Sequence, residues 1–302
     1  AEAAQNAAQN NQCEANTVEE ILARDDLEII VNLTIPSAHA EISQKILESG
    51  KHVYSEKPLC LDLADAREIL DLAEKKQLRV GCAPDTFLGA GLQTCRKWID
   101  ENLLGQITGG SAHMLNSGPE SWHPKPGFFY LRGGGPVFDM APYYITALVH
   151  LLGPVKRVTA IASKPYEERI ATCQEQYGKQ LPVEVNTHIS AVLEFESGAI
   201  LDTMFSFDVR KHTHPPIELY GTNGSMQVPD PNSFGGPVRA CTDRKDWQDY
   251  DLTHPYPTNT RSIGVADMAH AIRSGRAHRA SGELACHTLE VMLAFDQSSE
   301  SK

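Results

Sequence analysis

The first part of the chain alternates between apolar runs and amphipathic segments. Leu27–Leu33 is a nearly continuous apolar run rich in β-branched residues, which is typical of a parallel strand covered on both faces. We expect further strands at His52–Ser55 and Arg79–Cys82. Helices are predicted between them, over Ala38–Ser49 and Leu63–Lys76. Because strand and helix alternate in this way, the pattern predicts a doubly wound α/β domain.

After residue 84 the pattern changes to strands with apolar residues at every second position. Val185–Phe195 alternates in this way, and Ser197-Gly198 turns it back into Ala199–Phe207. Ile217–Tyr220 and Ser225–Val228 predict a second hairpin. We therefore expect two domains, residues 1–84 and residues 85–302, the second an α+β domain with an antiparallel sheet and helices to one side. The helices expected in it run over about Gly91–Asn102, Asp139–Leu152, Ile263–Arg273 and Ser281–Phe295.

Composition and charge exclude several classes of protein. The chain has 302 residues, of which 41% are hydrophobic, so it can form a packed core. It carries 27 Lys and Arg against 39 Asp and Glu, a net charge of -12, and the basic residues are scattered, which argues against a nucleic-acid partner. No apolar run approaches the roughly 18 residues of a membrane span. The 7 cysteines are far apart with no CxxC pair, so we expect free thiols and a cytoplasmic protein.

Candidate ligand contacts follow the first predicted strand. In an open α/β sheet, ligands bind beyond the carboxyl ends of the strands. Asn32 lies near the end of this strand, Thr34 and the peptide groups before Pro36 can face a ligand, and His39 falls in the first turn of the next helix. A simple strand-to-helix turn is the alternative interpretation.

A charged pair, Glu56-Lys57, follows the second predicted strand and precedes Pro58. A lysine buried there is costly unless it has a partner or a chemical role. The alternative is an ion pair at the surface.

A third candidate begins with three glycines, Gly133 to Gly135, which allow a close approach of the backbone. Asp139 and Tyr143 are four residues apart and so share one face of the following helix, where Pro142 is tolerable only in the first turn. Asp139 as a simple N-cap is the alternative. A tyrosine with a reference pKa of about 10 becomes a usable acid or base when an ammonium group stabilises its phenolate. A lysine, a tyrosine and an aspartate together can therefore move a hydroxyl proton.

The order of these motifs resembles one family. Thr34-Ile-Pro-Ser-Ala-His39, Glu56-Lys57-Pro58 and Gly133-Gly-Gly with Asp139 and Tyr143 together look like the Gfo/Idh/MocA oxidoreductases. The resemblance implies an N-terminal Rossmann domain for NAD or NADP and a C-terminal domain with a large, mostly antiparallel sheet. It also implies hydride transfer between the nicotinamide and a carbon of a sugar or cyclitol.

The same resemblance implies roles for individual residues. Lys57 would hold and polarise the reacting hydroxyl, and Asp139 would contact the substrate. Tyr143 would be the acid or base where many members have histidine, as in the glucose-fructose oxidoreductase and dihydrodiol dehydrogenase branch. The candidate cofactor contacts are Asn32, Thr34, Pro36, His39, Glu56 and Lys57.

One family feature does not occur in this sequence. The family begins with a strand, a Gly-x-Gly-x-x-Gly turn and a second strand, and none of these precedes Ala1. The pyrophosphate normally rests on the helix that follows this turn. We therefore expect the chain to lack the first βαβ unit, including the residue that distinguishes NAD from NADP.

Substrate contacts are expected from the loop before the glycine run. Trp122, His123 and Tyr130 are candidates for stacking on a sugar or hydrogen bonding to it, with loop packing as the alternative. Four polar residues that follow a predicted strand could reach the same cleft. They are Asp208, Arg210, His212 and His214. Since His212 and His214 lack companion ligands at metal-binding spacing, we expect no metal site.

Two other functions fit parts of the sequence. A non-catalytic sugar-binding or scaffold protein would explain the absent glycine-rich turn, and a cofactor-independent lyase or isomerase could use Lys57 and Tyr143 for proton abstraction. In the second domain, Ile189 and Leu193 on one face and Val192 on the other leave both faces of the sheet partly apolar. We therefore expect a homodimer or homotetramer formed through this sheet.

Overall fold

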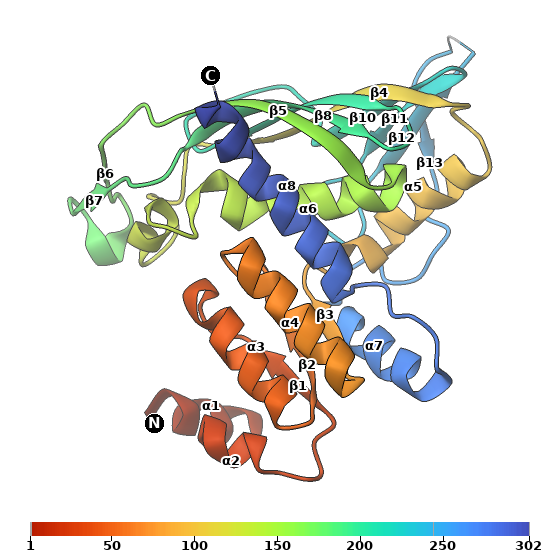
Figure 1. Ribbon diagram of the computed structural model, residues 1–302. Coiled ribbons are helices and arrows are strands. Elements are labelled where there is room, and N and C mark those ends of the chain that lie inside the picture. Colours follow the sequence, from red (N-terminus) through yellow and green to blue (C-terminus); the bar gives the residue numbers. More distant parts are fainter. Residues whose placement is uncertain (1, 244, 302) are drawn as a thin grey trace.

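The chain folds into two domains, each built around one β-sheet (Figure 1). The structure is a computed structural model and describes residues 2–243 and 245–301. Each domain has its own hydrophobic core, one around Ile46, Val53 and Ile69 and the other around Ile145 and Phe205. Among the described helices, none is both long enough and apolar enough to cross a membrane.

The smaller domain has the parallel sheet that the apolar runs predict. Its three strands lie in the order β1-β2-β3, and α3 and α4 pack against the sheet and each other. Thr17 and Glu20 form the capping box that starts the short helix α2. The elements are α1 (Glu2–Asn11), α2 (Val18–Leu22), β1 (Ile29–Asn32), α3 (His39–Glu48), β2 (His52–Ser55), α4 (Leu63–Lys76) and β3 (Val80–Cys82).

The larger domain contains an eight-stranded sheet in the order β13-β12-β11-β10-β4-β9-β8-β5. It is mostly antiparallel, as expected, but the interior pair β4 and β9 is parallel. The strands are β4 (Ile107–Leu115), β5 (Val155–Ser163), β8 (His188–Phe195), β9 (Ile200–Ser206), β10 (Ile217–Gly221), β11 (Gly224–Val228), β12 (Val238–Thr242) and β13 (Gln248–Tyr250). A separate hairpin, β6 (Glu168–Ile170) and β7 (Gln180–Pro182), extends to one side (Figure 1).

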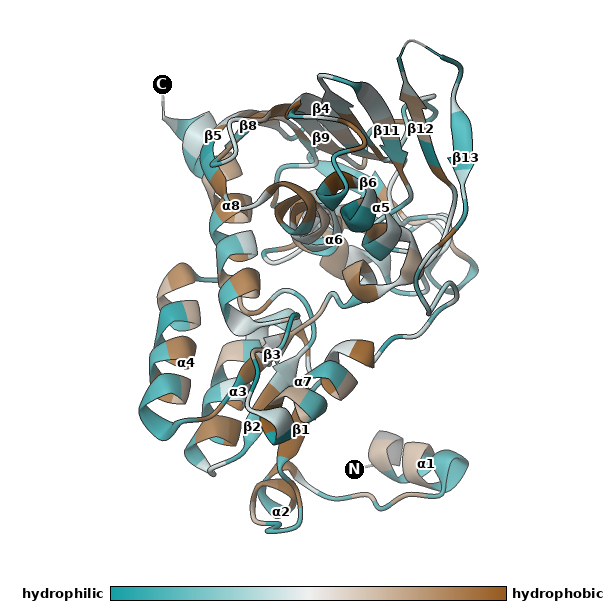
Figure 2. Cartoon of the chain, turned by 90° about the vertical axis from the view of Figure 1, so that its right-hand side faces the viewer, coloured by the Kyte–Doolittle hydropathy of each residue, from teal (hydrophilic) through white to brown (hydrophobic). Residues whose placement is uncertain are grey.

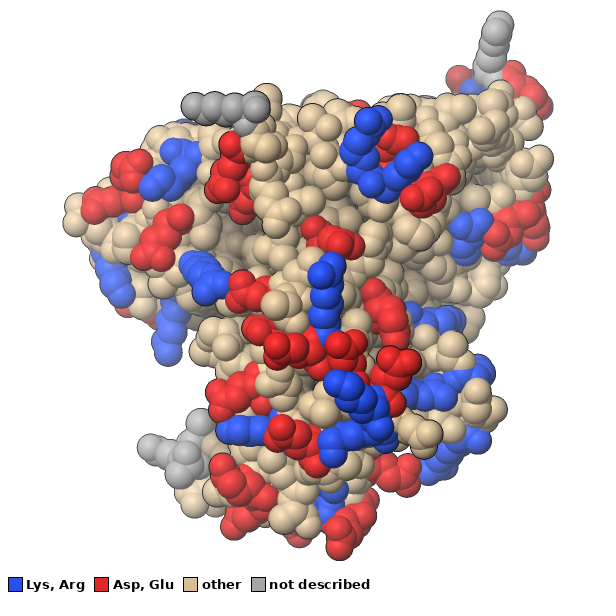
Figure 3. All heavy atoms as spheres, viewed as in Figure 1, with Lys and Arg blue, Asp and Glu red and all other residues tan. Residues whose placement is uncertain are grey.

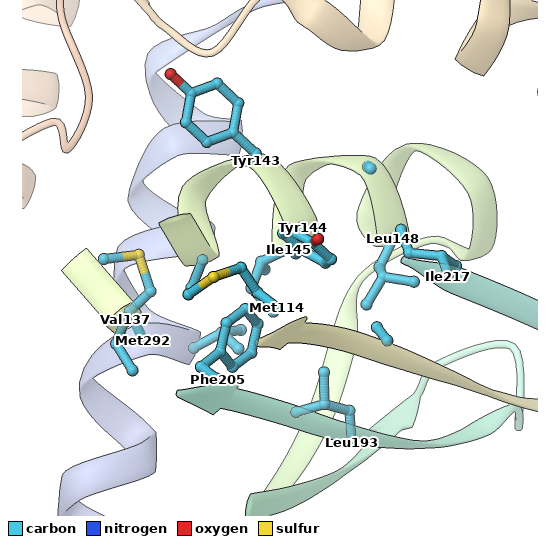
Figure 4. Packing of buried hydrophobic residues seen from close by; sticks show 14 of the residues in the cluster. Met114, Val137, Tyr143, Tyr144, Ile145, Leu148, Leu193, Phe205, Ile217 and Met292 are labelled. Carbon is cyan, nitrogen blue, oxygen red and sulfur yellow. The ribbon is translucent and has the colours of Figure 1, made fainter. Parts of the chain in front are cut away.

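Helix α6 (Gly135–Leu152) lies between the large sheet and the smaller domain (Figure 2). Its residues Ile145 and Leu148 are fully buried beneath the sheet, near Phe205 of β9. Tyr143 projects from the opposite side of the helix, away from Phe205 (Figure 4). The helix therefore supports the sheet with one face and directs Tyr143 toward the smaller domain.

Helix α6 begins four residues earlier than the sequence predicts. It starts at Gly135 with Gly134 as its N-cap, and Gly135 has a φ of 74°, which glycine adopts without strain. Asp139 is therefore inside the helix, so its interpretation as an N-cap is wrong. Pro142 is the eighth residue of the helix, not part of the first turn. Because proline has no N–H, the carbonyl of Phe138 loses its helical partner there.

The last two helices return to the smaller domain. They are α7 (Ile263–Ser274) and α8 (Gly282–Glu300), and α8 runs along both domains (Figure 1). Ser281 bridges to Gly81 of β3, and Leu289 is buried in the smaller domain's core. The predicted boundary after residue 84 follows β3, but both domains then share the C-terminal helices. On the face shown in Figure 3, Lys and Arg side chains are interspersed with Asp and Glu side chains and form no extended basic patch.

Candidate active site

Lys57 and Asp139 pair across the boundary between the two domains. Lys57 follows the carboxyl end of β2, and Asp139 lies in the second turn of α6. The Lys57 Nζ donates to Asp139 Oδ1 at 3.0 Å and to the Asp139 carbonyl at 2.5 Å. The two side chains are only 17% and 24% exposed. The side chain of Lys57 thus pairs with Asp139 and not with its neighbour Glu56. The ion pair links the two domains and is not an ion pair on the protein surface.

Tyr143 lies one helical turn after Asp139 and is 8% exposed. The Lys57 Nζ is 5.4 Å from the centre of its ring. Burial raises the pKa of the Tyr143 phenol above its usual value of 10.0, while Lys57 and then Arg261 lower it. The ammonium group of Lys57 therefore lowers the pKa of Tyr143 as predicted, but burial raises this pKa by more.

Arg261 is a site residue that the sequence analysis missed. Its guanidinium carbon is 5.7 Å from the centre of the Tyr143 ring, and its Nη2 donates to Asn232 Oδ1 at 2.9 Å. The following residue, Ser262, has a φ of 86°, a conformation that costs energy for any residue except glycine. Asp85 holds this turn, because its carboxylate accepts the backbone N–H groups of Ser262 and Gly264 at 2.9 Å each. Nothing in the local sequence marks Arg261, which lies 118 positions after Tyr143.

These groups line a cavity of about 280 Å³, which we call the substrate cavity. Trp122 and Phe129 form its apolar wall, and Trp122 is 66% exposed. An apolar wall beside charged side chains suits a ligand that carries both apolar surfaces and hydroxyl groups. The residues that line the cavity are Lys57, Asn116, Gly118, Pro119, Trp122, Phe129, Asp139, Met140, Tyr143, Phe207, Asn232 and Arg261.

Two of the predicted substrate residues lie elsewhere. Tyr130 is fully buried beneath the guanidinium of Arg169, so its prediction as a substrate contact is wrong in this structure. His123 does not line the substrate cavity. Its Nδ1 accepts the backbone N–H of Lys125 at 3.0 Å. Of the consecutive residues Phe129 and Tyr130, it is Phe129 that lines the substrate cavity.

A neighbouring cavity of about 220 Å³ lies at the carboxyl ends of β1 and β2, and we call it the cofactor cavity. Leu33 and Glu56 line it, and it shares Arg261 with the substrate cavity. The buried hydroxyls of Tyr54 and Ser55 also lie in its wall and have no hydrogen-bond partner within the described part of the chain. Apolar walls with unsatisfied hydroxyls fit a nicotinamide ring and its carboxamide.

The candidates after β1 have different roles. Asn32 is buried, and its amide donates to the His39 carbonyl and to Ser43 Oγ at 3.1 Å each. His39 is fully buried, with its two ring nitrogens 2.6 and 2.9 Å from the carbonyl oxygens of Pro58 and Thr34. Both side chains are thus occupied inside the protein, so the prediction that Asn32 and His39 contact the cofactor does not hold for their side chains. Thr34 is exposed and Pro36 half-buried at the end of the strand.

The residues after β9 divide between two regions. Asp208 and Arg210 line a further cavity beside the substrate cavity. His212 and His214 lie outside both cavities, where the His214 ring packs 4.4 Å from that of His113.

Comparison with known proteins agrees with the fold of both domains. Residues 1–83 match the model of an oxidoreductase family with an NAD-binding Rossmann fold, and residues 92–227 match the GFO/IDH/MocA C-terminal domain. The chain belongs to the Gfo/Idh/MocA family of oxidoreductases. The matched NAD-binding fold identifies the cofactor class as NAD or NADP.

Relatives with assigned names include two sugar dehydrogenases. The levoglucosan dehydrogenase of Pseudarthrobacter phenanthrenivorans is 25% identical over 67% of this chain, and the D-glucoside 3-dehydrogenase of Escherichia coli is 28% identical over 64% of it. The matched part spans 56% of each of these relatives. A solved levoglucosan dehydrogenase in complex with NADH and levoglucosan has the same fold, with a TM-score of 0.81 and 21% identity over 99% of this chain and 85% of that one.

Proposed function

We propose that this protein is an NAD(P)-dependent oxidoreductase that acts on a hydroxyl-bearing carbon of a sugar or cyclitol. The observation that carries the proposal is the meeting of Lys57, Asp139 and Tyr143 where the substrate cavity adjoins the cofactor cavity. The names of the two relatives, a levoglucosan dehydrogenase and a D-glucoside 3-dehydrogenase, support a sugar as the substrate class. We also assign the chain to the branch of the family with a phenol at the acid or base position.

Each residue of the site has a separate task in this proposal. Lys57 donates a hydrogen bond to the reacting oxygen, and its ammonium group stabilises negative charge there. Asp139 holds the ammonium group in place through the 3.0 Å contact. Tyr143 takes or returns the hydroxyl proton, since its phenol faces the same cavity. The bound nicotinamide supplies the hydride acceptor or donor.

Replacement of Lys57 tests the proposal. In Lys57→Ala we expect turnover of the sugar substrate to fall by about 10²–10⁴, because the reacting oxygen loses its donor and the phenolate its nearest cation. Steady-state rates are measured on the full-length polypeptide with a panel of sugars and cyclitols. The control is Lys75→Ala, on the exposed face of α4, which we expect to leave the rate unchanged. Near-normal turnover in Lys57→Ala, with the fold verified by circular dichroism, contradicts the proposal.

A fluorescence titration with NADH and then NADPH separates the enzyme from its alternatives. We expect saturable binding of one of the two, and the tighter ligand identifies the preferred cofactor. Absence of binding to either leaves two explanations, an enzyme that needs the glycine-rich βαβ unit and a non-catalytic sugar-binding protein, and a titration of the chain with an added upstream βαβ segment decides between them. Turnover without any nicotinamide favours the lyase or isomerase.

We further propose that the protein is a homodimer or homotetramer formed through the outer face of the large sheet. On that face, Ile161 of β5, Val192 of β8 and Ile200 of β9 are 77%, 45% and 54% exposed. The strand register places all three on one side of the sheet. An exposed apolar surface on neighbouring strands is typical of a contact surface between proteins.

A further inference from the structure

A second cavity adjoins the substrate cavity on the side of the β6–β7 hairpin. It has a volume of about 370 Å³ and is bounded by the loop after β4, the hairpin and the end of β9. We call it the annex. Gly118 and Phe207 line both cavities. Gly118 has a φ of 91°, and a Cβ there would come within 2.2 Å of Glu120 Oε2, so the shared wall carries no side chain at this position.

The inner wall of the annex is a buried ionic network. Arg169 of β6 pairs with Glu120 Oε1 at 3.0 Å and with Asp208 Oδ1, and it also donates to the carbonyl of Phe207 at 3.0 Å. Thr187 donates to the second oxygen of Asp208 at 2.7 Å. Both terminal nitrogens of Arg169 are therefore engaged. Two carboxylates surround this guanidinium, so Arg169 itself does not present a free positive charge to an anion. Arg210 also lines the annex, and the charges of Glu120 and Asp208 balance those of the two arginines, which favours a neutral ligand.

The rim of the annex offers an aromatic face and free hydroxyls. The Tyr166 ring is 52% exposed, and the Arg169 guanidinium carbon lies 4.8 Å from its centre, which holds the ring against the cavity. The hydroxyls of Ser117, Ser121 and Thr172 have no hydrogen-bond partner among the residues that the structure describes. A pyranose ring needs the same combination, an apolar surface for its C–H groups and polar groups for its hydroxyls.

We propose that the annex binds a second, non-reacting sugar residue, so that the substrate is a neutral disaccharide or a longer glycoside. This inference rests on the proposed function, because it assigns the first sugar residue to the substrate cavity. The annex exceeds the roughly 150 Å³ of a cavity that holds a benzene-sized ring, and so has room for a pyranose. The reacting sugar contacts Lys57 and Tyr143, and the glycosidic bond passes Gly118.

The kinetic test compares disaccharides with their monosaccharides. The probes are neutral disaccharides of glucose, galactose, mannose and xylose. We expect wild-type kcat/KM to favour one disaccharide, and Tyr166→Ala to lower that value by about tenfold while leaving the monosaccharide within twofold. The matched control is Tyr177→Ala, since Tyr177 is an 80% exposed tyrosine in the same region that does not line the annex. Equal losses for both sugars, or no loss in Tyr166→Ala, overturn the proposal.

A binding measurement separates this proposal from the proposed function. Saturation-transfer NMR with the same disaccharides reports contact of each ring with the protein without any turnover. Contact of both rings in wild type, and loss of the signal from one ring in Tyr166→Ala, supports the annex even if no oxidation occurs. Contact of one ring only, or no contact, overturns it even if a monosaccharide is oxidised. Inorganic phosphate that binds in place of the disaccharides, and is lost in Arg210→Ala, overturns it in favour of an anion site.

Discussion

At the scale of single residues, the site depends on opposing effects on one phenol. Tyr143 is buried, which favours its neutral form, while Lys57 and Arg261 favour the phenolate. The sequence motif contains Lys57 and Tyr143, but Arg261 reaches the ring from the turn before α7. The pKa of Tyr143 therefore depends on two cations from different parts of the chain.

Replacement of Arg261 is expected to move the pH dependence of the reaction. In the proposed function the phenolate accepts the hydroxyl proton in the oxidation direction, so we expect the rate to rise with pH through the pKa of Tyr143. Arg261 lowers this pKa, and Arg261→Leu should raise it. We expect the rising limb of kcat against pH to shift by about one pH unit upward. The control is Arg67→Leu, on the exposed face of α4. If the rising limb of kcat against pH does not move in Arg261→Leu, then Arg261 does not act on the pKa of Tyr143.

At the scale of elements, helix α7 holds the loop that leads to α8. Asp267 of α7 is buried, and its carboxylate accepts the Arg276 guanidinium at 2.7 Å and the Arg279 backbone N–H at 2.8 Å. Burial alone would raise the pKa of Asp267, but the hydrogen bonds from Arg276 and Arg279 outweigh it and hold the pKa at about 2. This carboxylate thereby fixes how α8 enters the core of the smaller domain.

Because the pKa of Asp267 is lower in the folded state, its contribution to stability is present above pH of about 4 and is lost as the pH falls toward about 2. We expect Asp267→Asn to lower the free energy of unfolding at pH 7 by about 2 kcal/mol. The difference from wild type should shrink at pH 3. Urea unfolding at both pH values measures this. Asp71→Asn, on the exposed face of α4, serves as the reference, and a loss in Asp267→Asn that does not depend on pH would contradict the assigned role.

At the scale of the whole molecule, the large sheet has one face covered and one face open. Helices α6 and α8 cover the inner face, where Leu193 and Ile189 are fully buried. The outer face carries Ile161, Val192 and Ile200. The alternation within each strand predicted this division, and an association of copies through the outer face would bury its apolar side chains.

Charged residues on that face should break the association. We expect the wild-type protein to sediment as a dimer or tetramer and the double variant Ile161→Lys with Ile200→Lys to sediment at the mass of one chain, 33.2 kDa. Sedimentation velocity measures this, with Val18→Lys on α2 as the control. A wild-type protein of 33.2 kDa, or a double variant that remains associated, would contradict the proposed interface.

Local pattern was enough to predict much of the secondary structure and to select Lys57, Asp139 and Tyr143, which the structure brings together. Strand β2 and helix α4 have the predicted bounds, and the capping box of Thr17 and Glu20 is likewise a local feature of the sequence. Periodicity and capping act between residues a few positions apart, so the sequence displays them directly. The motif that contains Lys57 and Asp139 was recognisable for a similar reason, because it is defined by residue types and their order in the sequence.

Only the tertiary structure decided which of the candidates face a cavity. His39 and Tyr130 are of residue types that often bind ligands, yet both are fully buried. Arg261 joins the site because Asp85 holds its turn, a contact between residues 177 positions apart. The parallel pairing of β4 with β9 also joins distant segments. Burial and such pairings depend on how the whole chain packs, and no local pattern of residues encodes that packing.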